Sequence, residues 1–362
     1  MDNLLFDSCG IEVSAKTLLV RRSQGENTLP TQTFANTPAG HRKVIRFLKP
    51  QGRPVRICME STGTYGLDLA LALGGIAGLE LTVANPRAVR RFAQALQVRG
   101  KTDRLDVEVL QEFARRMPQQ RWLAPSQACL QLRALARRLE DLAQQRTIEK
   151  NRLHALSVTN STPAILLRQL KLTVQRLEQD SQEILGEALR LIEQEANLKS
   201  RYQLLLTITG VGKLSAVQIL AELAVLGEER TARQWVAFAG LDPKPCQSGS
   251  SVDRKACLSK AGCAHLRRAL YMPALVAASH DPQVRNFYNH LLQRGKLPLQ
   301  ALCAIMRKLL HAIHAMIRTA QPFDSKRLFA PHLHADTKPH SPEPAANNIP
   351  PSPPEISALS SP

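Results

Sequence analysis

Val55-Arg56-Ile57-Cys58-Met59-Glu60 is the stretch of sequence that decides the fold of the first third of this chain. Its short, mostly apolar run predicts a buried β-strand, and Gly63 then precedes an apolar helix that runs through Leu73. Leu79–Ala84 predicts a second strand of the same kind, after which Pro86 begins another helix. The order strand, helix, strand, helix is typical of an α/β domain.

The segments on either side of this unit complete the expected domain. Upstream, β-rich runs separated by polar turns predict a meander of strands, and downstream the pattern predicts one last helix. The expected elements are strands at Leu4–Phe6 with Gly10–Val13, at Thr17–Arg22 and at Thr31–Phe34, a helix capped by Asn36 or Thr37 ahead of Pro38, and a helix from about Thr102 to Arg116. This order is the layout of a ribonuclease-H-like α/β domain, which we expect over residues 1–122.

The rest of the chain is expected to be largely helical. Heptad seams within residues 123–200, broken at Asn160–Pro163, predict a coiled-coil helical hairpin or a helix pair that associates with another subunit. The seam residues are Leu132, Leu135, Leu139, Leu142, Leu153 and Leu156, then Leu167, Leu170, Val174, Leu177, Ile184 and Leu191. Residues 201–325 predict a compact helical domain, and the Pro- and Ser-rich residues 326–362 predict a disordered tail.

The charge balance favours a polyanionic partner. The chain has 362 residues with 48 Lys and Arg against 30 Asp and Glu, a net charge of +18, which promotes binding through counterion release. Aromatic residues make up only 4%, so large base-stacking platforms are not expected to dominate that binding. No signal peptide and no membrane-spanning apolar run is recognisable, so we expect a cytoplasmic protein without a membrane partner.

The cysteines predict reduced thiols rather than a disulfide framework or a metal centre. Seven are scattered along the chain, and none forms a C-x-x-C pair. Cys257, Cys263 and His265 are close in sequence, but their spacing matches no common zinc pattern.

Four carboxylates in the first domain are candidates for a metal site. Glu12 lies on the first strand and Glu60 ends the Val55–Met59 strand, while Asp103 and Asp106 share one face of the last helix. Hard divalent cations such as Mg²⁺ or Mn²⁺ prefer carboxylate oxygens, and two such ions can clamp the attacking and leaving oxygens of a phosphodiester. A single acid at such a position is more often solvated or a helix cap. The presence of all four acids in this order, on the predicted strands and helix, favours a metal site over solvated or capping acids.

Basic residues surround the same region and could neutralise backbone phosphates, although each alone is more often a solvated charge. They are Arg87, Arg90, Arg91, Arg99, Lys101 and Arg104. Farther along, the segment from Leu206 to Lys213 resembles a helix–hairpin–helix motif. Its glycines would let the turn approach a phosphate, but a plain packing corner would look similar.

A serine-bearing loop follows in the third region. Gln247-Ser248-Gly249-Ser250-Ser251 lies just after Phe238–Pro243. Basic residues cluster beyond it, at Arg254, Lys255, Lys260, Arg267 and Arg268. A serine that faces phosphate-binding groups could attack a phosphodiester and form a phosphoserine link, whereas most serines in such loops are turn residues.

These motifs together resemble one family over roughly residues 8 to 320. The matching segments are Gly10–Leu18, Met59–Gly63, Asn85-Pro86, Lys101–Asp106, Ile208–Gly212, Ala239–Pro243, Gln247–Gly249, Ser259–Gly262 and Leu266–Leu270. In this order they are similar to the DEDD transposases of the IS-one-ten insertion-sequence family, which are recombinases guided by a bridge RNA.

The resemblance implies a RuvC-like first domain whose four acids are Glu12, Glu60, Asp103 and Asp106. It also implies a serine nucleophile, placed at Ser248 because this residue precedes Gly249 in the matching motif, with Ser250 and Ser251 as alternatives. The partners implied are the DNA of the element and its target, a structured guide RNA and further copies of the chain, as a dimer or tetramer. The location implied is the bacterial nucleoid.

The sequence departs from the family at Glu12, where relatives usually carry Asp. The extra methylene shifts the carboxylate and bears on the metal geometry. Two other interpretations remain open: a metal-only RuvC-like nuclease or Holliday-junction resolvase, and a nucleic-acid-binding remnant without activity.

Overall fold

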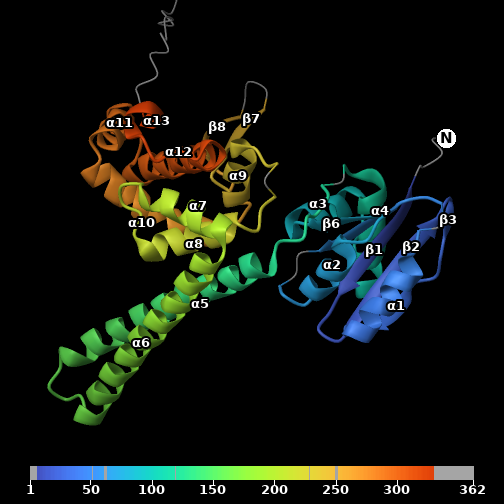
Figure 1. Cartoon of the computed structure of the whole chain (residues 1–362), viewed down its shortest axis with the longest axis horizontal. Helices are drawn as coiled ribbons and strands as arrows, with labels where there is room; N and C mark the ends of the chain where they lie inside the picture. The colour runs from blue at the N-terminus through green and yellow to red at the C-terminus, as the bar shows by residue number, and fades with distance from the viewer. Residues whose placement is uncertain are drawn as a thin grey trace, which may run out of the picture.

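The computed structural model describes residues 6–50, 52–60, 63–118, 120–227, 229–248 and 252–329, and among these the side chains of 245–248 and 252–256 are not described. Figure 1 shows a sheet domain at the N-terminal end, a long helical hairpin, and a compact helical domain at the C-terminal end. A short segment after α4 joins the sheet domain to the first helix of the hairpin.

The sheet domain is a mixed sheet with helices, and its order is consistent with a ribonuclease-H-like fold. Its strands are β1 (Asp7–Val13), β2 (Thr17–Gln24), β3 (Asn27–Thr28), β4 (Gln32–Ala35), β5 (Val55–Glu60) and β6 (Leu79–Ala84). The strand order is β3-β2-β1-β5-β6, and β4 also pairs with β2. β2 is antiparallel to β1 and β4, whereas β5 is parallel to both β1 and β6. The expected meander and alternating units are therefore both present.

Helices cover both faces of this sheet. The helices are α1 (Pro38–Leu48), α2 (Leu67–Gly74), α3 (Pro86–Ala95) and α4 (Asp103–Arg116). Val44 and Leu48 of α1 and Leu69 of α2 pack in one apolar core, while Val89 of α3 and Leu110 of α4 pack in another. The side chain of Thr37 accepts a hydrogen bond from the amide of Gly40 at the start of α1, the cap expected from the sequence.

The segment after α4 fastens to the sheet before it enters the hairpin. The amide of Trp122 donates to the carbonyl oxygen of Leu81 over 2.6 Å, and the hydroxyl of Thr82 donates to the carbonyl oxygen of Gln120 over 3.0 Å. The Trp122 ring lies over Gly74, where a Cβ atom would be 3.0 Å from it. The chain thus crosses the β6 edge before it leaves the sheet domain.

The helical hairpin consists of α5 (Gln127–Ser157) and α6 (Ala164–Gln194), which run side by side and project away from both domains (Figure 1). Leu132, Leu139 and Leu142 of α5 are buried, as is Val174 of α6. These positions belong to the two expected seams, and Leu132 and Leu139 are also part of the core of the helical domain. Towards the tip, Arg146 and Lys150 of α5 both form ion pairs with Glu178 of α6.

The helical domain surrounds one large apolar core that includes the base of the hairpin. Its elements are α7 (Ala196–Leu206), α8 (Lys213–Leu223), α9 (Ala232–Ala239), β7 (Pro243–Ser248), β8 (Val252–Leu258), α10 (Ala264–His280), α11 (Pro282–Gln293), α12 (Pro298–Thr319) and α13 (Ser325–Phe329). None of the described helices combines the length and apolar character needed to cross a membrane.

Three details differ from the sequence expectations. The serine-bearing segment, expected as a loop in a helical domain, forms the antiparallel pair β7–β8. A short strand, Asn27–Thr28, pairs with β2 where none was expected. The tail expected to be disordered from residue 326 begins with helix α13, because the buried ring of Phe329 packs against Phe287 and Phe323. The rest of that tail, 330–362, and the first two residues of the expected Leu4–Phe6 strand lie outside the described part of the chain.

Candidate active site

Three elements bring the four predicted acids to one end of the sheet. Glu12 lies on β1 and Glu60 ends β5, and these parallel strands pair so that Ile11 is opposite Met59. Asp103 and Asp106 lie in the first turn of α4, which packs on β1. Ser61 and Thr62, which follow Glu60 in the matching motif, lie outside the described residues.

Close packing of α4 on β1 sets this arrangement. A Cβ atom at Gly10 would be 2.3 Å from the carbonyl oxygen of Val107 and 2.5 Å from the amide nitrogen of Gln111. No other residue type fits there without moving the helix. Glu12 is on the same face of β1, two residues on, and Asp106 immediately precedes Val107. Gly10 therefore allows the strand and helix acids to approach one another.

The carboxylates interact electrostatically. The pKa of Glu12 is raised to about 7, first by burial and then by the charges of the other three acids. Burial, and then the charge of Asp106, raises the pKa of Glu60. The pKa of Asp106 is also raised, by burial first, with a further contribution from Asp103. The positive charge of Lys101 opposes each of these three shifts.

The chemistry of this cluster fits a hard divalent cation. Carboxylate oxygens are the ligands such an ion prefers, and a cation would relieve the repulsion that raises these pKa values. Within the described residues, however, no three His, Cys, Asp or Glu side chains are grouped closely enough to hold a metal ion. The four acids thus supply suitable oxygen donors and interact electrostatically, but their side chains are too far apart to coordinate one ion together.

Exposed basic side chains lie on α3 and at the start of α4. Arg90 and Arg91 lie on the exposed side of α3, which begins at Pro86 with the side chain of Asn85 as its cap. Lys101 and Arg104 flank the start of α4 and are also exposed. In the part of the chain that is described, none of these four cations has an ion-pair partner. The predicted phosphate-binding residues of the first domain are therefore free to meet a ligand.

The predicted nucleophile lies in the other domain. Ser248 is the last residue of β7, opposite Val252 of β8. Gly249, Ser250 and Ser251 lie outside the described residues, as do the side chains of Ser248, Arg254 and Lys255. The hairpin is fastened at its base, where the hydroxyl of Ser259 donates to the carboxylate of Asp242.

Two glycines and an arginine allow the backbone segments at the base of this hairpin to pack closely together. A Cβ atom at Gly262 would be 2.1 Å from the carbonyl oxygen of Phe238, and one at Gly240, which has φ +63°, would be 2.9 Å from the amide of Ala261. The end of α9 and the start of α10 can touch for this reason. Arg267 secures the contact by donating to the carbonyl oxygen of Ala239 over 2.7 Å. Its guanidinium, predicted to bind nucleic acid, is engaged with the protein backbone.

The hairpin turn before α8 packs in the same close way. Gly210 has φ +91°, and a Cβ atom there would be 2.7 Å from the carbonyl oxygen of Pro273 in α10. Lys213 is the first residue of α8 and its side chain is exposed. The turn thus has a packing role against α10, while Lys213 remains available to a phosphate.

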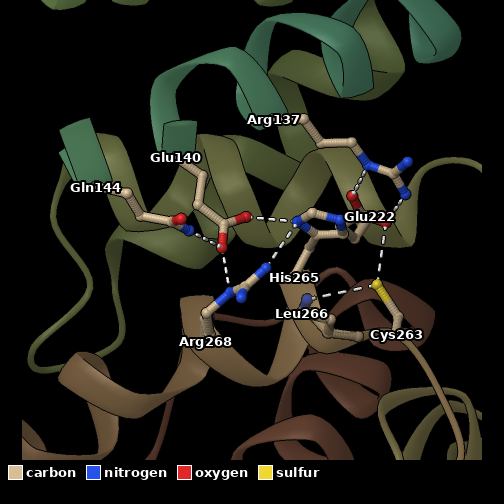
Figure 2. Close-up of polar contacts among 8 residues, drawn as sticks. All are labelled: Arg137, Glu140, Gln144, Glu222, Cys263, His265, Leu266 and Arg268. Atoms are coloured by element: carbon tan, nitrogen blue, oxygen red, sulfur yellow. Dashed lines mark hydrogen bonds and ion pairs between the residues drawn. The ribbon is translucent and has the colours of Figure 1, made fainter. Parts of the chain in front are cut away.

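Figure 2 shows a polar network that the sequence did not reveal, at the junction of α5, α8 and α10. Glu222 of α8 is only 2% exposed, and Arg137 of α5 donates to both of its oxygens over 2.8 and 3.2 Å. The thiol of Cys263 donates to Glu222 over 3.3 Å. Burial favours the neutral acid, but the hydrogen bonds and charge of Arg137 outweigh it, so the pKa of Glu222 is lowered.

A second part of the network ties α5 to α10. Glu140 forms ion pairs with both His265 and Arg268 (Figure 2). These side chains line a cavity of about 520 Å³ between the hairpin base and the helical domain. Arg268, predicted to bind nucleic acid, is held by Glu140. Cys263 contacts Glu222, and His265 contacts Glu140.

No sequence signal could have revealed this network, because its partners are far apart in the chain. His265 and Glu140, for example, are separated by 125 positions.

The described cysteines are all free thiols, as the sequence predicts.

Comparison with known proteins gives a family match in the N-terminal part of the chain and another in the C-terminal part. Residues 9–158 match a family of transposases defined by the DEDD domain of IS110 elements. Residues 202–289 match the family described as transposase IS116/IS110/IS902. The two matches lie in the sheet domain with its following helix and in the helical domain, respectively.

Named relatives agree with these matches. The chain is 28% identical over 306 residues to the pilin gene-inverting proteins of Moraxella bovis and Moraxella lacunata, covering 83% of this chain and 92% of each relative. It is also 29% identical over 122 residues to an IS110 insertion element protein of Streptomyces coelicolor, covering 34% of this chain and 30% of that protein. The chain is an enzyme that belongs to the IS116/IS110/IS902 family of transposases and carries a DEDD domain at its N-terminal end.

Proposed function

We propose that this transposase breaks and rejoins DNA through a covalent link to Ser248, with the carboxylates of the sheet domain holding Mg²⁺ or Mn²⁺ at the scissile phosphate. The observation that carries the proposal is the gathering of four acids from three elements. Burial raises the pKa values of Glu12, Glu60 and Asp106, and the charges of neighbouring acids raise each of them further. Acids with no binding role are seldom gathered at such a cost in repulsion.

Glu12, Glu60, Asp103 and Asp106 would bind the cation by moving their side chains together, since they are not closed around a site as they stand. The bound ion would supply positive charge to the non-bridging oxygens of the phosphate. Exposed Arg90, Arg91 and Arg104 would orient the flanking DNA by contacting its backbone.

The reaction we propose is an exchange of phosphodiester bonds. The hydroxyl oxygen of Ser248 attacks phosphorus, its proton is lost, and the bond from phosphorus to one sugar oxygen breaks and that oxygen gains a proton. Attack by a sugar hydroxyl of another strand reverses these steps, releases Ser248 and joins the new strands. One phosphoester bond breaks for each that forms, so no nucleotide cofactor is consumed.

The placement of the reacting groups favours an assembly of more than one chain. The acids lie in the sheet domain and Ser248 lies in the helical domain (Figure 1). The hairpin offers an association surface, because Val158, Ile165 and Leu172 near its tip are 76%, 56% and 58% exposed. We propose that copies of the chain associate through this surface, as a dimer or tetramer, so that acids of one copy meet the serine of another.

The proposed partners are DNA and a structured RNA encoded beside the gene. The relatives named for pilin gene inversion support a DNA rearrangement as the outcome. The net charge of +18 and the unpaired cations around the acids support binding to nucleic acid. The guide RNA rests on the family resemblance, and we place the reaction at the nucleoid in the cytoplasm because its DNA substrate is there.

The test is a search for a protein–DNA adduct on a denaturing gel. Purified protein is mixed with Mg²⁺, labelled DNA carrying the joined ends of the element, and RNA transcribed from the flanking non-coding segment. Ser248→Ala and Glu60→Ala are tested in parallel, with Ser250→Ala and Ser251→Ala to assign the nucleophile. An adduct that Ser248→Ala alone among the serine variants abolishes supports the proposal.

The separation of the acids and Ser248 into different domains also favours a simpler candidate, a metal-only RuvC-like nuclease. Cleavage without an adduct, retained in Ser248→Ala and lost in Glu60→Ala, would establish that candidate and refute the serine mechanism. No cleavage and no adduct with any metal would instead identify a binding remnant.

A further inference from the structure

Helix α12 carries two arginines and two histidines along one face. Arg307, His311, His314 and Arg318 follow one another at intervals of four, three and four residues, which keeps them on one side of the helix. Arg307 and Arg318 are exposed or partly exposed, as are the two histidines. At about 1.5 Å per residue this row is roughly 16 Å long.

Helix α9 lies beside this face and adds to it (Figure 1). Nε2 of His314 donates to the carbonyl oxygen of Arg230, just before α9, over 2.9 Å, and its ring meets that of Trp235 edge-on at 5.0 Å. These contacts fix the histidine against α9. They also bring the backbone at Arg230 against α12, and Arg233 of α9 lies near enough to His311 to lower its pKa.

Basic side chains from both α9 and α12 lie near His311. Its pKa is lowered, first by burial and then by the positive groups Arg307, His314 and Arg233. Every charged group that shifts it is a cation or another histidine. Neither α9 nor α12 contains an acid, and within the described residues Arg233 and Arg307 have no ion-pair partner.

This contrasts with other arginines of the helical domain and the hairpin base. Arg137 is paired with Glu222, Arg268 with Glu140, and Arg267 with backbone carbonyls. Those arginines are satisfied within the fold, whereas Arg233 and Arg307 form no ion pair within the described part of the chain and both lower the pKa of His311. Such an arrangement is stabilised by an anion from outside.

The Arg307 end of this row on α12 lies near the base of the β7–β8 hairpin, which carries Ser248. Lys260 follows β8, is exposed, and lies close enough to Cys303 of α12 to lower the pKa of its thiol against the larger effect of burial. Cys303 is four residues before Arg307, on the same face of α12. Basic side chains thus lie both near the base of β7–β8, at Lys260, and along α12, at Arg307 and Arg318.

We propose that this surface, made by Lys260, Arg307, His311, Arg318 and the α9 residue Arg233, binds the phosphate backbone of DNA that runs on from the strand at Ser248. The choice of DNA rests on the proposed function, because Ser248 would be joined to DNA. Binding to the surface itself does not depend on that chemistry. Lysine and arginine side chains spread over a surface neutralise backbone charge without reading bases.

The test is the salt dependence of DNA binding. The full chain is titrated with a short labelled DNA duplex of arbitrary sequence in EDTA, so that no strand is cut, over a range of salt concentrations. The variant is Arg233→Gln with Arg307→Gln. Its control is Arg294→Gln with Arg327→Gln, which removes the same charge from the end of α11 and from α13; these helices pack on the Lys308 side of α12.

The variant should bind the duplex several-fold more weakly, and the slope of log affinity against log salt should fall by about 0.9 for each phosphate that the variant no longer neutralises. The control should keep the wild-type slope. Equal slopes in variant and wild type, or equal losses of affinity in variant and control, would overturn the proposal. So would a loss of affinity seen with an RNA duplex of the same sequence and absent with DNA.

Ser248→Ala separates this inference from the proposed function. It should bind the duplex with the wild-type affinity and slope, because the proposed surface contains no nucleophile. A chain that forms no covalent adduct but shows the slope change would refute the serine chemistry and leave the DNA surface supported.

Discussion

Gly10 of β1 lies directly beneath Val107 of α4, so close that a Cβ atom on Gly10 would be 2.3 Å from the Val107 carbonyl oxygen. This contact sets how near α4 comes to the sheet. The strand acid Glu12 and the helix acid Asp106 are each within two residues of it. The geometry of the carboxylate cluster therefore depends on a residue that has no side chain.

Gly10→Ala should disrupt the cluster. The added methyl group must push α4 away from β1, which costs about 1–3 kcal/mol by overpacking and separates the acids. Thermal unfolding should show the loss of stability, and metal-dependent DNA cleavage should fall with it. Gly186→Ala is the matched control: nothing lies within 4 Å of its Cβ position in α6, so it should leave stability unchanged or raise it by about 0.5–1 kcal/mol. Equal effects of the two changes would contradict the packing argument.

Mg²⁺ should stabilise the chain more at high pH than at low pH. The pKa of Glu12 is raised from 4.5 to about 7 in the fold, so the folded chain binds this proton more tightly than the unfolded chain does. The contribution of Glu12 to the free energy of unfolding is therefore largest below pH 4.5, and it is lost as the pH rises through about 7. A bound cation restores it where the acids are ionised, and at about ten times its dissociation constant contributes about 1.4 kcal/mol. Melting temperatures with Mg²⁺ and with EDTA, at about pH 8 and about pH 5, measure this.

Glu12→Gln provides the check on that prediction. It removes one repelling charge, so the chain in EDTA should be more stable at about pH 8 than the wild type, and Mg²⁺ should add less. A Mg²⁺ effect of the same size at both pH values, or one that survives in Glu12→Gln, would show that the ion acts elsewhere.

Glu222→Gln should loosen the junction between the hairpin and the helical domain. It leaves Arg137 without its anion, and because Arg137 is 42% exposed at the side chain, we expect a loss of about 1–3 kcal/mol rather than more. Glu187→Gln on α6, which breaks an exposed pair with Arg190, should cost under about 0.5 kcal/mol. Thermal unfolding compares them.

The pH dependence of the Glu222→Gln effect has a definite sign. The folded pKa of Glu222 is lowered, so its stabilisation is full above the unfolded pKa near 4.5 and is lost as the pH falls through the folded value. The difference between wild type and variant should therefore be constant at neutral pH and shrink below about pH 4. A difference that grows on acidification would refute the ion-pair account.

Ile165→Asp with Leu172→Asp should weaken self-association. These residues are seven positions apart on one face of α6, and both are more than half exposed. Sedimentation should show a smaller species with unchanged unfolding temperature, because neither side chain is in the core. Leu297→Asp, at a site 65% exposed before α12, is the control and should leave the mass unchanged. An oligomer unaffected by the double change would exclude this surface.

The sequence by itself determined the sheet domain and the order of its elements. Strand and helix periodicities are local properties, so the strands at Val55–Met59 and Leu79–Ala84 could be recognised without the fold, whereas the helix cap was left open between Asn36 and Thr37. The spacing of Asp103 and Asp106 placed them on one helix face for the same reason. The heptad seams also predicted that α5 and α6 would pair.

Only the tertiary structure decided which charges remain free. Arg267 and Arg268 looked like phosphate-binding residues in the sequence, but a backbone carbonyl 28 positions away and Glu140 engage them. Arg233 and Arg307, which have no motif around them, are left unpaired and adjacent among the described residues. An ion pair depends on distance in space and on burial, and neither is encoded in local sequence. The β7–β8 pairing belongs to the same class, since a strand is specified by its partner as much as by its own residues.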